Sequence, residues 1–236
     1  MKPFVTLDSE IMGARAGRTM FITFEGIEGS GKSMQIARAE SYLLQNGIPC
    51  IITREPGGTE FGKAVRRILL DPAGAAREPE SELLLYLADR YQHLKEIIEP
   101  ALRRHITVLS DRYHDATRAY QGAARKISPA TISDMARLLG IRDPDATILL
   151  DLEPTLGLER ARNRNIAVPS AGDEGRFEAE DLSFHRDVRS AYLALARLEP
   201  ERIRIVPAHG TPEDVFSRIV PLLQEWCQID RRSDGS

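Results

Sequence analysis

The sequence predicts an α/β fold in which a five-stranded parallel sheet carries helices on both faces. Short apolar runs alternate with stretches of helical periodicity along the 236-residue chain. No linker rich in proline, glycine or serine divides the chain, which indicates one large domain. A glycine-rich loop at residues 26–33 lies between the first apolar run and the first helical stretch. Parallel α/β folds bind phosphate groups at this position.

The predicted strands are short apolar runs that contain Ile, Val or Thr. They cover residues 20–24, 48–53, 106–109, 146–150 and 203–206. Because helical segments separate these runs, we expect parallel pairing with both faces of the sheet covered. Ligands of such sheets bind at the carboxyl ends of the strands, so the residues that follow each strand form the candidate site.

The segments between the strands place apolar residues at helical spacing. They are expected to be helical over residues 33–46, 59–70, 79–104, 114–121, 128–139, 154–163, 180–198 and 212–227. Residues 165–175 are polar and rich in Gly, Ser and Pro, which predicts a mobile loop.

The charge balance limits the possible partners of the protein. A formal net charge of −3 gives no general attraction to nucleic acid or to an anionic membrane. An anionic ligand must therefore be held by local clusters of arginine. No run approaches the length of about eighteen apolar residues that a membrane span needs, so we expect a soluble protein.

The predicted domain covers residues 20–228 and leaves two short ends. Residues 1–19 lack a continuous apolar core, so we expect a flexible extension rather than a signal peptide. Residues 229–236 are expected to form a C-terminal tail. The two cysteines, Cys50 and Cys227, are predicted to be a buried thiol and a surface thiol in a reducing cytosol, which favours a cytoplasmic location.

The glycine-rich loop matches the phosphate-binding pattern G-x-x-x-x-G-K-[ST]. Its residues are Gly26, Ile27, Glu28, Gly29, Ser30, Gly31, Lys32 and Ser33. Glycines let several backbone N–H groups point at a polyphosphate, and the helix that follows adds partial positive charge. Lys32 is expected to reach the β- and γ-phosphates, and the Ser33 hydroxyl to bind Mg²⁺. The alternative is a glycine-rich turn that fits the pattern by chance, which the strand–loop–helix context disfavours.

Two arginines follow the second and third predicted strands and indicate a second phosphate site. Arg54 lies in the run T-R-E-P-G-G-T, and Arg112 follows Asp111 in the run D-R-Y. Both are expected at the edge of the sheet that carries the phosphate loop. Asp111 is placed to hold Mg²⁺, directly or through water. The alternative is that Asp111 and Arg112 cap the next helix or pair with neighbouring side chains.

Three arginines close the helix that follows the fourth strand. Arg160, Arg162 and Arg164 lie just ahead of the polar loop. A basic helix end that runs into a mobile loop suits a lid, at about residues 160–178, that closes over a transferring phosphate. The alternative is a solvated helix end followed by an ordinary surface loop.

Taken together, these motifs resemble the thymidylate kinase family of P-loop NTPase-type enzymes, which phosphorylate dTMP with ATP. The resemblance covers about residues 20–228. Its most specific parts are residues 24–33, the T-R-E-P-G-G-T run at 53–59, D-R-Y at 111–113 and A-Y-Q-G at 119–122. It implies a Mg²⁺-dependent kinase that acts on two nucleotides and forms a homodimer.

The resemblance also implies roles for individual residues. ATP binding falls to residues 26–33 and Arg160, metal binding to Ser33 and Asp111, and catalysis to Glu28, Lys32, Arg112 and Arg164. The residues implied in dTMP binding are Arg54 and Arg112 at the phosphate, Tyr86 and Arg90 at the base, and Thr117 and Tyr120 at the base and sugar. The phosphate loop has no arginine after Glu28, so the chain resembles the bacterial type whose lid supplies the catalytic arginine.

Two positions depart from the family pattern close to the expected base pocket. Ala116 stands where members often have serine, and Arg118 stands where some relatives have a glutamine that reaches the base. Two alternatives to a dTMP kinase therefore stay open. One is a kinase of the same fold for dUMP or CMP. The other is a non-enzymatic P-loop module that binds ATP, which the pair Arg54 and Arg112 argues against.

Overall fold

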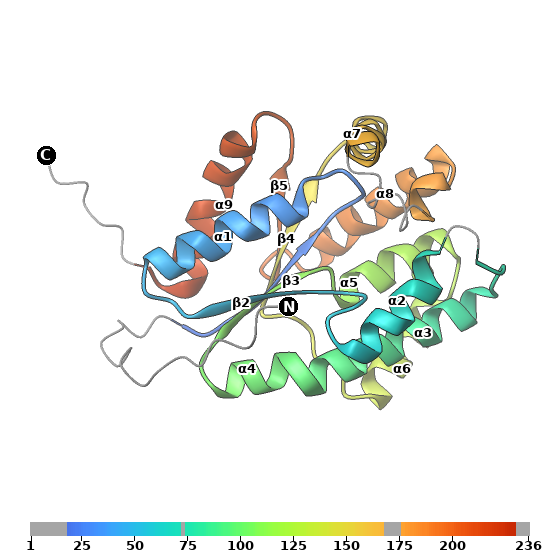
Figure 1. Cartoon of the computed structure of the whole chain (residues 1–236), viewed down its shortest axis with the longest axis horizontal. Coiled ribbons are helices and arrows are strands. Elements are labelled where there is room, and N and C mark those ends of the chain that lie inside the picture. Colours follow the sequence, from blue (N-terminus) through green and yellow to red (C-terminus); the bar gives the residue numbers. More distant parts are fainter. Residues whose placement is uncertain (1–17, 72–73, 168–175, 230–236) are drawn as a thin grey trace, which may run out of the picture.

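The centre of the protein is a parallel sheet of five strands in the order β2-β3-β1-β4-β5 (Figure 1). The computed structural model describes residues 18–71, 74–167 and 176–229, except for the side chains of 164–167. The strands are β1 (Phe21–Glu25), β2 (Cys50–Arg54), β3 (Thr107–Asp111), β4 (Ala146–Asp151) and β5 (Ile203–Pro207). The predicted fold class and all five predicted strands are thus confirmed.

Each strand extends beyond its predicted end by one or two residues. β1 to β4 end in Glu25, Arg54, Asp111 and Asp151, which an apolar pattern cannot include. They still pair in the ladder, as Arg54 does with Asp111 and Phe24 with Asp111. Polar residues are tolerated there because the carboxyl ends of the strands face the site rather than the core.

Alternating residues of the central strands pack against opposite helical layers. Phe21 and Val108, which are paired in register, face Leu94, Ile98 and Ala101. Their neighbours Ile22 and Leu109 belong to the larger core. That core is formed with α1 (Lys32–Gln45), α8 (Leu182–Leu198) and α9 (Pro212–Cys227). Figure 1 shows α1 and α9 on one side of the sheet and α4 on the other.

The remaining helices follow the predicted positions, with local departures. They are α2 (Glu60–Leu70), α3 (Pro79–His93), α4 (Glu99–Arg103), α5 (His114–Thr117), α6 (Pro129–Leu138) and α7 (Pro154–Ala167). The stretch predicted as one helix at 79–104 is divided by a π-helical segment, Leu94–Ile98. This segment lies just ahead of Pro100, whose nitrogen cannot donate a helical hydrogen bond. A second π-helical segment, Arg118–Ala124, continues α5.

Two sequence predictions were wrong in detail. Helix α7 continues to Ala167, although residues 165–167 were predicted to begin the mobile loop. These residues contain no helix breaker, and the first one is Pro169. The rest of the predicted loop, 168–175, and residues 1–17 of the predicted extension at 1–19 lie outside the described residues. The two thiols were predicted the other way round, with Cys50 buried and Cys227 at the surface. In the structure Cys227 is fully buried at the end of α9, whereas Cys50 is only partly buried.

No helix within the described ranges combines the length and the apolar character needed to cross a bilayer.

Candidate functional site

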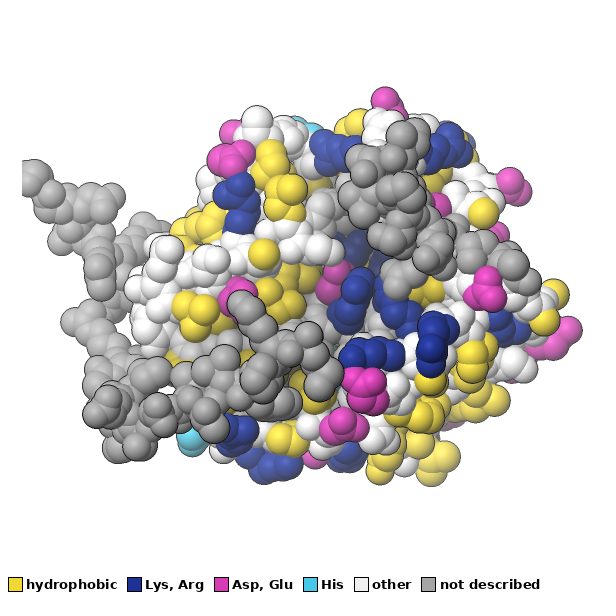
Figure 2. Space-filling view, viewed as in Figure 1, with side chains coloured by type: hydrophobic (Ala, Val, Ile, Leu, Met, Phe, Trp, Pro, Cys, Tyr) yellow, Lys and Arg dark blue, Asp and Glu magenta, His cyan; other side chains and the backbone are white. Residues whose placement is uncertain are grey.

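A cavity of about 810 Å³ opens at the carboxyl ends of the strands, between the phosphate loop, α3 and the π-helical segment after α5. Among the described residues that line it, six are cationic: Lys32, Arg54, Arg66, Arg90, Arg112 and Arg160. Figure 2 shows Lys and Arg side chains gathered around a hollow in the middle of this face of the molecule. Because the chain as a whole carries a net charge of −3, this local cationic character indicates an anionic ligand.

The phosphate loop forms a tight turn that only glycine can make at two positions. Gly26 has φ 137°, and a Cβ there would lie 2.5 Å from the Leu150 carbonyl oxygen. Gly29 has φ 70°, and a Cβ there would lie 2.0 Å from the carbonyl oxygen of Gly157 on α7. The loop is therefore fixed both to the end of β4 and to the helix that leads into the predicted lid.

Lys32 is held inside the loop, where its Nζ donates to the carbonyl oxygens of Gly26 and Ile27, each at 2.9 Å. Burial lowers the pKa of Lys32 to about 8, and the nearby Arg112 guanidinium acts in the same direction. The side chain therefore stays mostly charged at neutral pH. Its position directly behind the loop fits the predicted contact with a polyphosphate.

The Ser33 hydroxyl donates to Asp111 Oδ2 at 3.0 Å, which brings the two predicted metal ligands together. The structure has no group of three or more His, Cys, Asp or Glu side chains arranged for a metal, within the residues it describes. Mg²⁺ takes few protein oxygens and completes its shell with water and substrate phosphates. Ser33 and Asp111 are the residues that would hold it.

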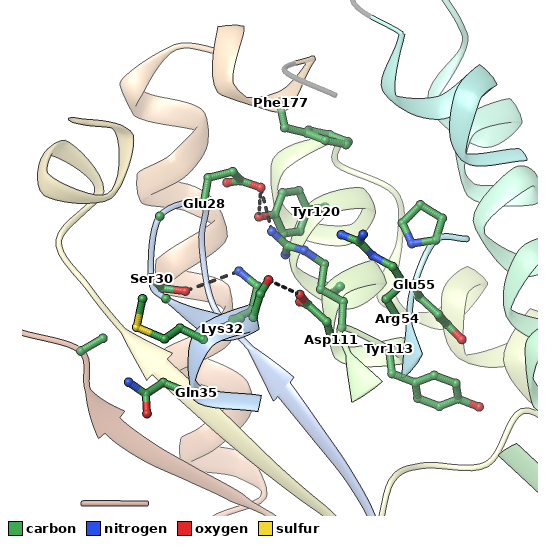
Figure 3. Close-up of a pocket in the computed structure, with 18 of the residues that line it drawn as sticks. Glu28, Ser30, Lys32, Gln35, Arg54, Glu55, Asp111, Tyr113, Tyr120 and Phe177 are labelled. Carbon is green, nitrogen blue, oxygen red and sulfur yellow. Dashed lines mark hydrogen bonds and ion pairs between the residues drawn. The ribbon is translucent and has the colours of Figure 1, made fainter. Parts of the chain in front are cut away.

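Glu28 and Arg112, which both line the cavity, form an ion pair. Arg112 Nη2 donates to Glu28 Oε1 at 2.8 Å, and the Tyr120 hydroxyl donates to the same oxygen at 2.7 Å. In Figure 3, Glu28 and Tyr120 point toward one another, with Phe177 beyond the tyrosine ring. Burial alone would raise the pKa of Glu28, but Arg112, His185 and Lys32 hold this pKa well below its usual range. Glu28 is thus a permanent anion.

Arg90 lines the cavity away from the phosphate loop, where it is 1% exposed and is held by hydrogen bonds on several sides. Its guanidinium donates to Glu55 Oε2 at 2.7 Å, to Thr117 Oγ1 at 2.7 Å and to the Tyr113 carbonyl oxygen at 2.9 Å. Tyr86, one turn earlier on α3, lines the same cavity. The structure therefore brings together the residues predicted to surround a base.

The predicted phosphate and sugar contacts also meet in the cavity. Arg54, Arg112, Thr117 and Tyr120 are all lining residues. Arg54 and Arg112 follow neighbouring strands, since Arg54 is paired in register with Asp111. Arg112 is partly paired, as the alternative interpretation expected, because Glu28 takes one of its nitrogens. It still lines the cavity with its side chain 19% exposed.

Two predicted residues need separate comment. Arg118, which stands where relatives have a base-contacting glutamine, is held by Glu199 at 2.8 Å and Asp143 at 3.3 Å and is not among the described lining residues. The expectation that position 118 lies close to the base pocket is therefore wrong for its side chain. The side chain of Arg164, the predicted catalytic arginine, lies outside the described residues.

Sequence reasoning missed the end of the cavity beyond the phosphate loop. The loop after β5 lines it through Ala208, Gly210 and Pro212. Arg160 donates to the Ala208 carbonyl oxygen at 3.1 Å, and Gln35 donates to the Pro212 carbonyl oxygen at 3.0 Å. These contacts are mostly made by backbone atoms. The only available signal was that this loop, too, follows the carboxyl end of a strand.

Three buried side chains behind the cavity were also missed. Glu25 Oε1 accepts from the Tyr113 backbone N–H at 2.8 Å, and its Oε2 accepts from the Tyr192 hydroxyl at 2.7 Å. Burial raises the pKa of Glu25 to about 7, and the Asp115 carboxylate adds to the rise. His185 is fully buried, with Nδ1 3.3 Å from Glu28 Oε2. His185 and Tyr192 lie far from the phosphate loop in the sequence, and Glu25, although it directly precedes that loop, has no role in the motif.

Comparisons with known proteins agree on one family. The family model described as thymidylate kinase matches residues 24–219. Thymidylate kinase from Oleidesulfovibrio alaskensis is 49% identical over 203 residues, which are 85% of this chain and 95% of the relative. The corresponding protein from Desulfosudis oleivorans is 46% identical over 213 residues, which are 90% of this chain and 100% of the relative. The crystal structure of thymidylate kinase from Ehrlichia chaffeensis matches with a TM-score of 0.70 and 29% identity, covering 88% of this chain and 100% of that one.

The raised pKa of Glu25 predicts a specific dependence of stability on pH. Between its ordinary value of 4.5 and about 7, the folded protein binds this proton more tightly than the unfolded chain does. Glu25 therefore lowers the free energy of unfolding as pH rises through that window, by an amount on the order of 3 kcal/mol. In Glu25→Gln this loss is absent, so the variant gains stability relative to the natural protein between pH 5 and pH 8.

Urea unfolding at both pH values measures this difference, with Glu60→Gln as the control because Glu60 is 81% exposed. A difference between Glu25→Gln and the natural protein that is the same at both pH values contradicts the raised pKa.

Proposed function

Because the chain belongs to the thymidylate kinase family, whose enzymes phosphorylate dTMP with ATP, we propose that its cavity transfers the γ-phosphate of ATP to dTMP to give dTDP. The observation that carries this proposal is one continuous cavity with two cationic ends. The phosphate loop with Lys32 lies at one end. Arg54, Arg90 and Arg112 line the other.

The donor end suits a nucleoside triphosphate bound with a magnesium ion. The backbone N–H groups of the loop and Lys32 bind the phosphates, and the loop after β5 together with Arg160 surrounds the adenine side. Ser33 and Asp111, which are hydrogen-bonded to each other, would hold Mg²⁺. When bound, the ion neutralises charge on the transferring phosphate.

The acceptor end suits a pyrimidine nucleoside monophosphate. Arg54 and Arg112 bind its phosphate, Tyr86 stacks on the base, and Arg90 donates to a carbonyl of the base. Four of the five N–H groups of Arg90 have partners among the described residues, so its remaining donor has a fixed direction. Thr117 and Tyr120 limit the space around base and sugar. A fixed donor of this kind discriminates between bases better than a flexible one does.

The reaction needs positioning and charge compensation more than proton transfer. The acceptor phosphate is already anionic and nucleophilic, so no strong general base is required. Lys32 and the arginines reduce the repulsion between the two anions and hold them in line. Glu28, a fixed anion beside Arg112 and Tyr120, orients the groups that hold the acceptor. Closure of the proposed lid would exclude water from the transferring phosphate.

A coupled assay of ADP release with a panel of acceptors tests this proposal. We expect dTMP to have the highest kcat/KM, ahead of dUMP, dCMP, CMP and dGMP, and EDTA to abolish turnover. If kcat/KM is greater for dUMP or CMP than for dTMP, the proposed acceptor is wrong and the better substrate takes its place. ATP binding without any acceptor-dependent ADP release would contradict a kinase and favour a binding module.

Arg164 is the proposed source of positive charge at the γ-phosphate during transfer. We expect Arg164→Ala to lower kcat by about 100-fold or more with little change in the KM for dTMP, since the contact strengthens only in the transition state. Steady-state kinetics measure both constants. Arg137→Ala is the control, because Arg137 is an exposed arginine of α6. Near-normal turnover of Arg164→Ala would exclude the assignment.

We further propose that the protein forms a homodimer through α2 and α3, which pack against each other. The exposed face of these helices carries Phe61 and Ile68 on α2 and Leu84 and Tyr91 on α3, which are 41–54% exposed in the single chain. Each pair is seven residues apart and therefore lies on one side of its helix. Such a patch on neighbouring helices is typical of an interface between subunits.

Sedimentation equilibrium tests the homodimer. We expect the natural protein to be dimeric at micromolar concentration and Phe61→Glu to be monomeric, because a charge would be buried in the interface. Leu138→Glu is the matched control, since Leu138 is 86% exposed on α6. A monomeric natural protein, or equal effects of both variants, would contradict this interface.

The remaining proposals concern the chain as a whole. We propose that residues 20–228 form the catalytic domain, that residues 160–178 act as its lid, and that the enzyme is cytoplasmic, as its nucleotide substrates and free cysteines suggest. Trypsin digestion with and without the two nucleotides tests the domain and lid boundaries. Cell fractionation tests the location.

A further inference from the structure

Arg112 meets Glu28 through only one of its nitrogens, which is unusual for an arginine beside a carboxylate. Arg112 Nη2 donates to Glu28 Oε1, whereas Glu28 Oε2 receives nothing from Arg112 and lies 3.3 Å from His185 Nδ1. Arginine and carboxylate groups favour a pair of parallel hydrogen bonds that uses two nitrogens and both oxygens. Here Glu28 Oε2 faces His185, and the second terminal nitrogen of Arg112, Nη1, has a different acceptor.

The Tyr192 hydroxyl, on α8, is that acceptor. Arg112 Nη1 donates to the Tyr192 oxygen at 3.4 Å, and the Tyr120 ring lies under the guanidinium, 4.8 Å from its centre. Tyr192 is 2% exposed, and its own hydroxyl proton is given to Glu25 Oε2 at 2.7 Å. When Glu25 is ionised, the Tyr192 proton points at its carboxylate, and the lone pairs of the Tyr192 oxygen face Arg112.

Glu25 in turn is fixed by backbone structure. It ends β1, and its other oxygen accepts from the Tyr113 backbone N–H at 2.8 Å. A chain of hydrogen bonds thus connects the end of the sheet to the guanidinium of Arg112. It runs from the Tyr113 backbone through Glu25 and Tyr192. Arg112 itself has φ 69°, so its backbone also has an uncommon, fixed direction.

We propose that Tyr192 is a positioning residue for the acceptor phosphate, because its hydroxyl keeps Nη1 of Arg112 away from Glu28 and available to a phosphate monoester. This inference rests on the proposed function, in which Arg112 binds that phosphate. Without the hydroxyl, Arg112 closes on Glu28 with both nitrogens, and the acceptor must then break two hydrogen bonds to bind. The donor nucleotide, which the phosphate loop holds, is not affected.

Tyr192→Phe removes this hydroxyl and keeps the ring that packs 6.3 Å from the ring of Tyr120. We expect the Kd and KM for dTMP to rise about fivefold or more, as for the loss of a hydrogen bond to a charged group. The KM for ATP and the kcat at saturating dTMP should stay within about twofold of the natural values. Calorimetry with dTMP alone and steady-state kinetics provide the two readouts.

Tyr42→Phe is the matched control. The Tyr42 hydroxyl accepts from Gln224 Nε2 at 3.0 Å between α1 and α9, and Tyr42 is not among the lining residues. We expect this variant to bind dTMP normally. Thermal unfolding of both variants measures any general loss of stability. Such a loss would not raise the Kd and KM for dTMP while leaving the KM for ATP unchanged.

Three outcomes would overturn the inference. An unchanged Kd for dTMP in Tyr192→Phe would remove the positioning role and leave the proposed function intact. An equal rise in the constants for dTMP and ATP would show that Tyr192 serves only the general structure. Absence of dTMP binding to the natural protein would overturn both the proposed function and this inference.

Discussion

Three cations of the cavity, buried or partly buried, are each bound to a protein acceptor, and the site depends on this constraint. An isolated buried charge is costly, whereas a paired and hydrogen-bonded one is tolerated. Lys32 is bound by two loop carbonyls, Arg112 by Glu28 and Arg90 by Glu55. Positive charge can therefore gather around one cavity before any anion arrives. Such charges need little reorganisation when a phosphate binds, which is how preorganised sites gain their effect.

The backbone supplies the directions that these pairs need. Parallel strands bring Glu25, Arg54 and Asp111 to one edge of the sheet, although they are distant in the sequence. The close approach of Gly29 to Gly157 then fixes the phosphate loop against α7. Because Arg160 also lies on α7, this contact joins the phosphate loop to the helix that carries a further cation of the cavity. A bulkier residue at either glycine would separate them.

Much of this arrangement could be predicted from the sequence, because the signals were local. The alternation of strands and helices predicted the sheet, and the position after each strand located residues 26–33, Arg54 and Asp111. Tyr86 and Arg90 were found only through the resemblance to a family, since on their own they have the pattern of an ordinary helix face. His185 and Tyr192 could not be predicted at all, and Glu25 stood in the motif at 24–33 without any role assigned to it. Their roles arise from contacts across the fold, such as the bond between Tyr192 and Glu25 over 167 positions.

Arg118 illustrates the opposite error, in which a local signal was followed too far. Its position in the motif suggested a contact with the base. However, several carboxylates lie within reach of the Arg118 guanidinium, and Glu199 and Asp143 form ion pairs with it. A long cationic side chain goes to the strongest available acceptors, which sequence spacing does not reveal.

Exposure separates the two kinds of arginine pair in this cavity. Arg90 and Glu55 are both almost completely buried, with side chains 1% and 2% exposed, so breaking their pair would leave an uncompensated charge in the interior. Arg112 and Glu28 are 19% and 12% exposed and lie on the wall of the cavity. An incoming phosphate can take over from Glu28 there, because the exchange replaces one anion by another at a partly solvated site. The geometry thus suits Arg90 to a fixed recognition role and Arg112 to binding an anion that arrives and leaves in every catalytic cycle.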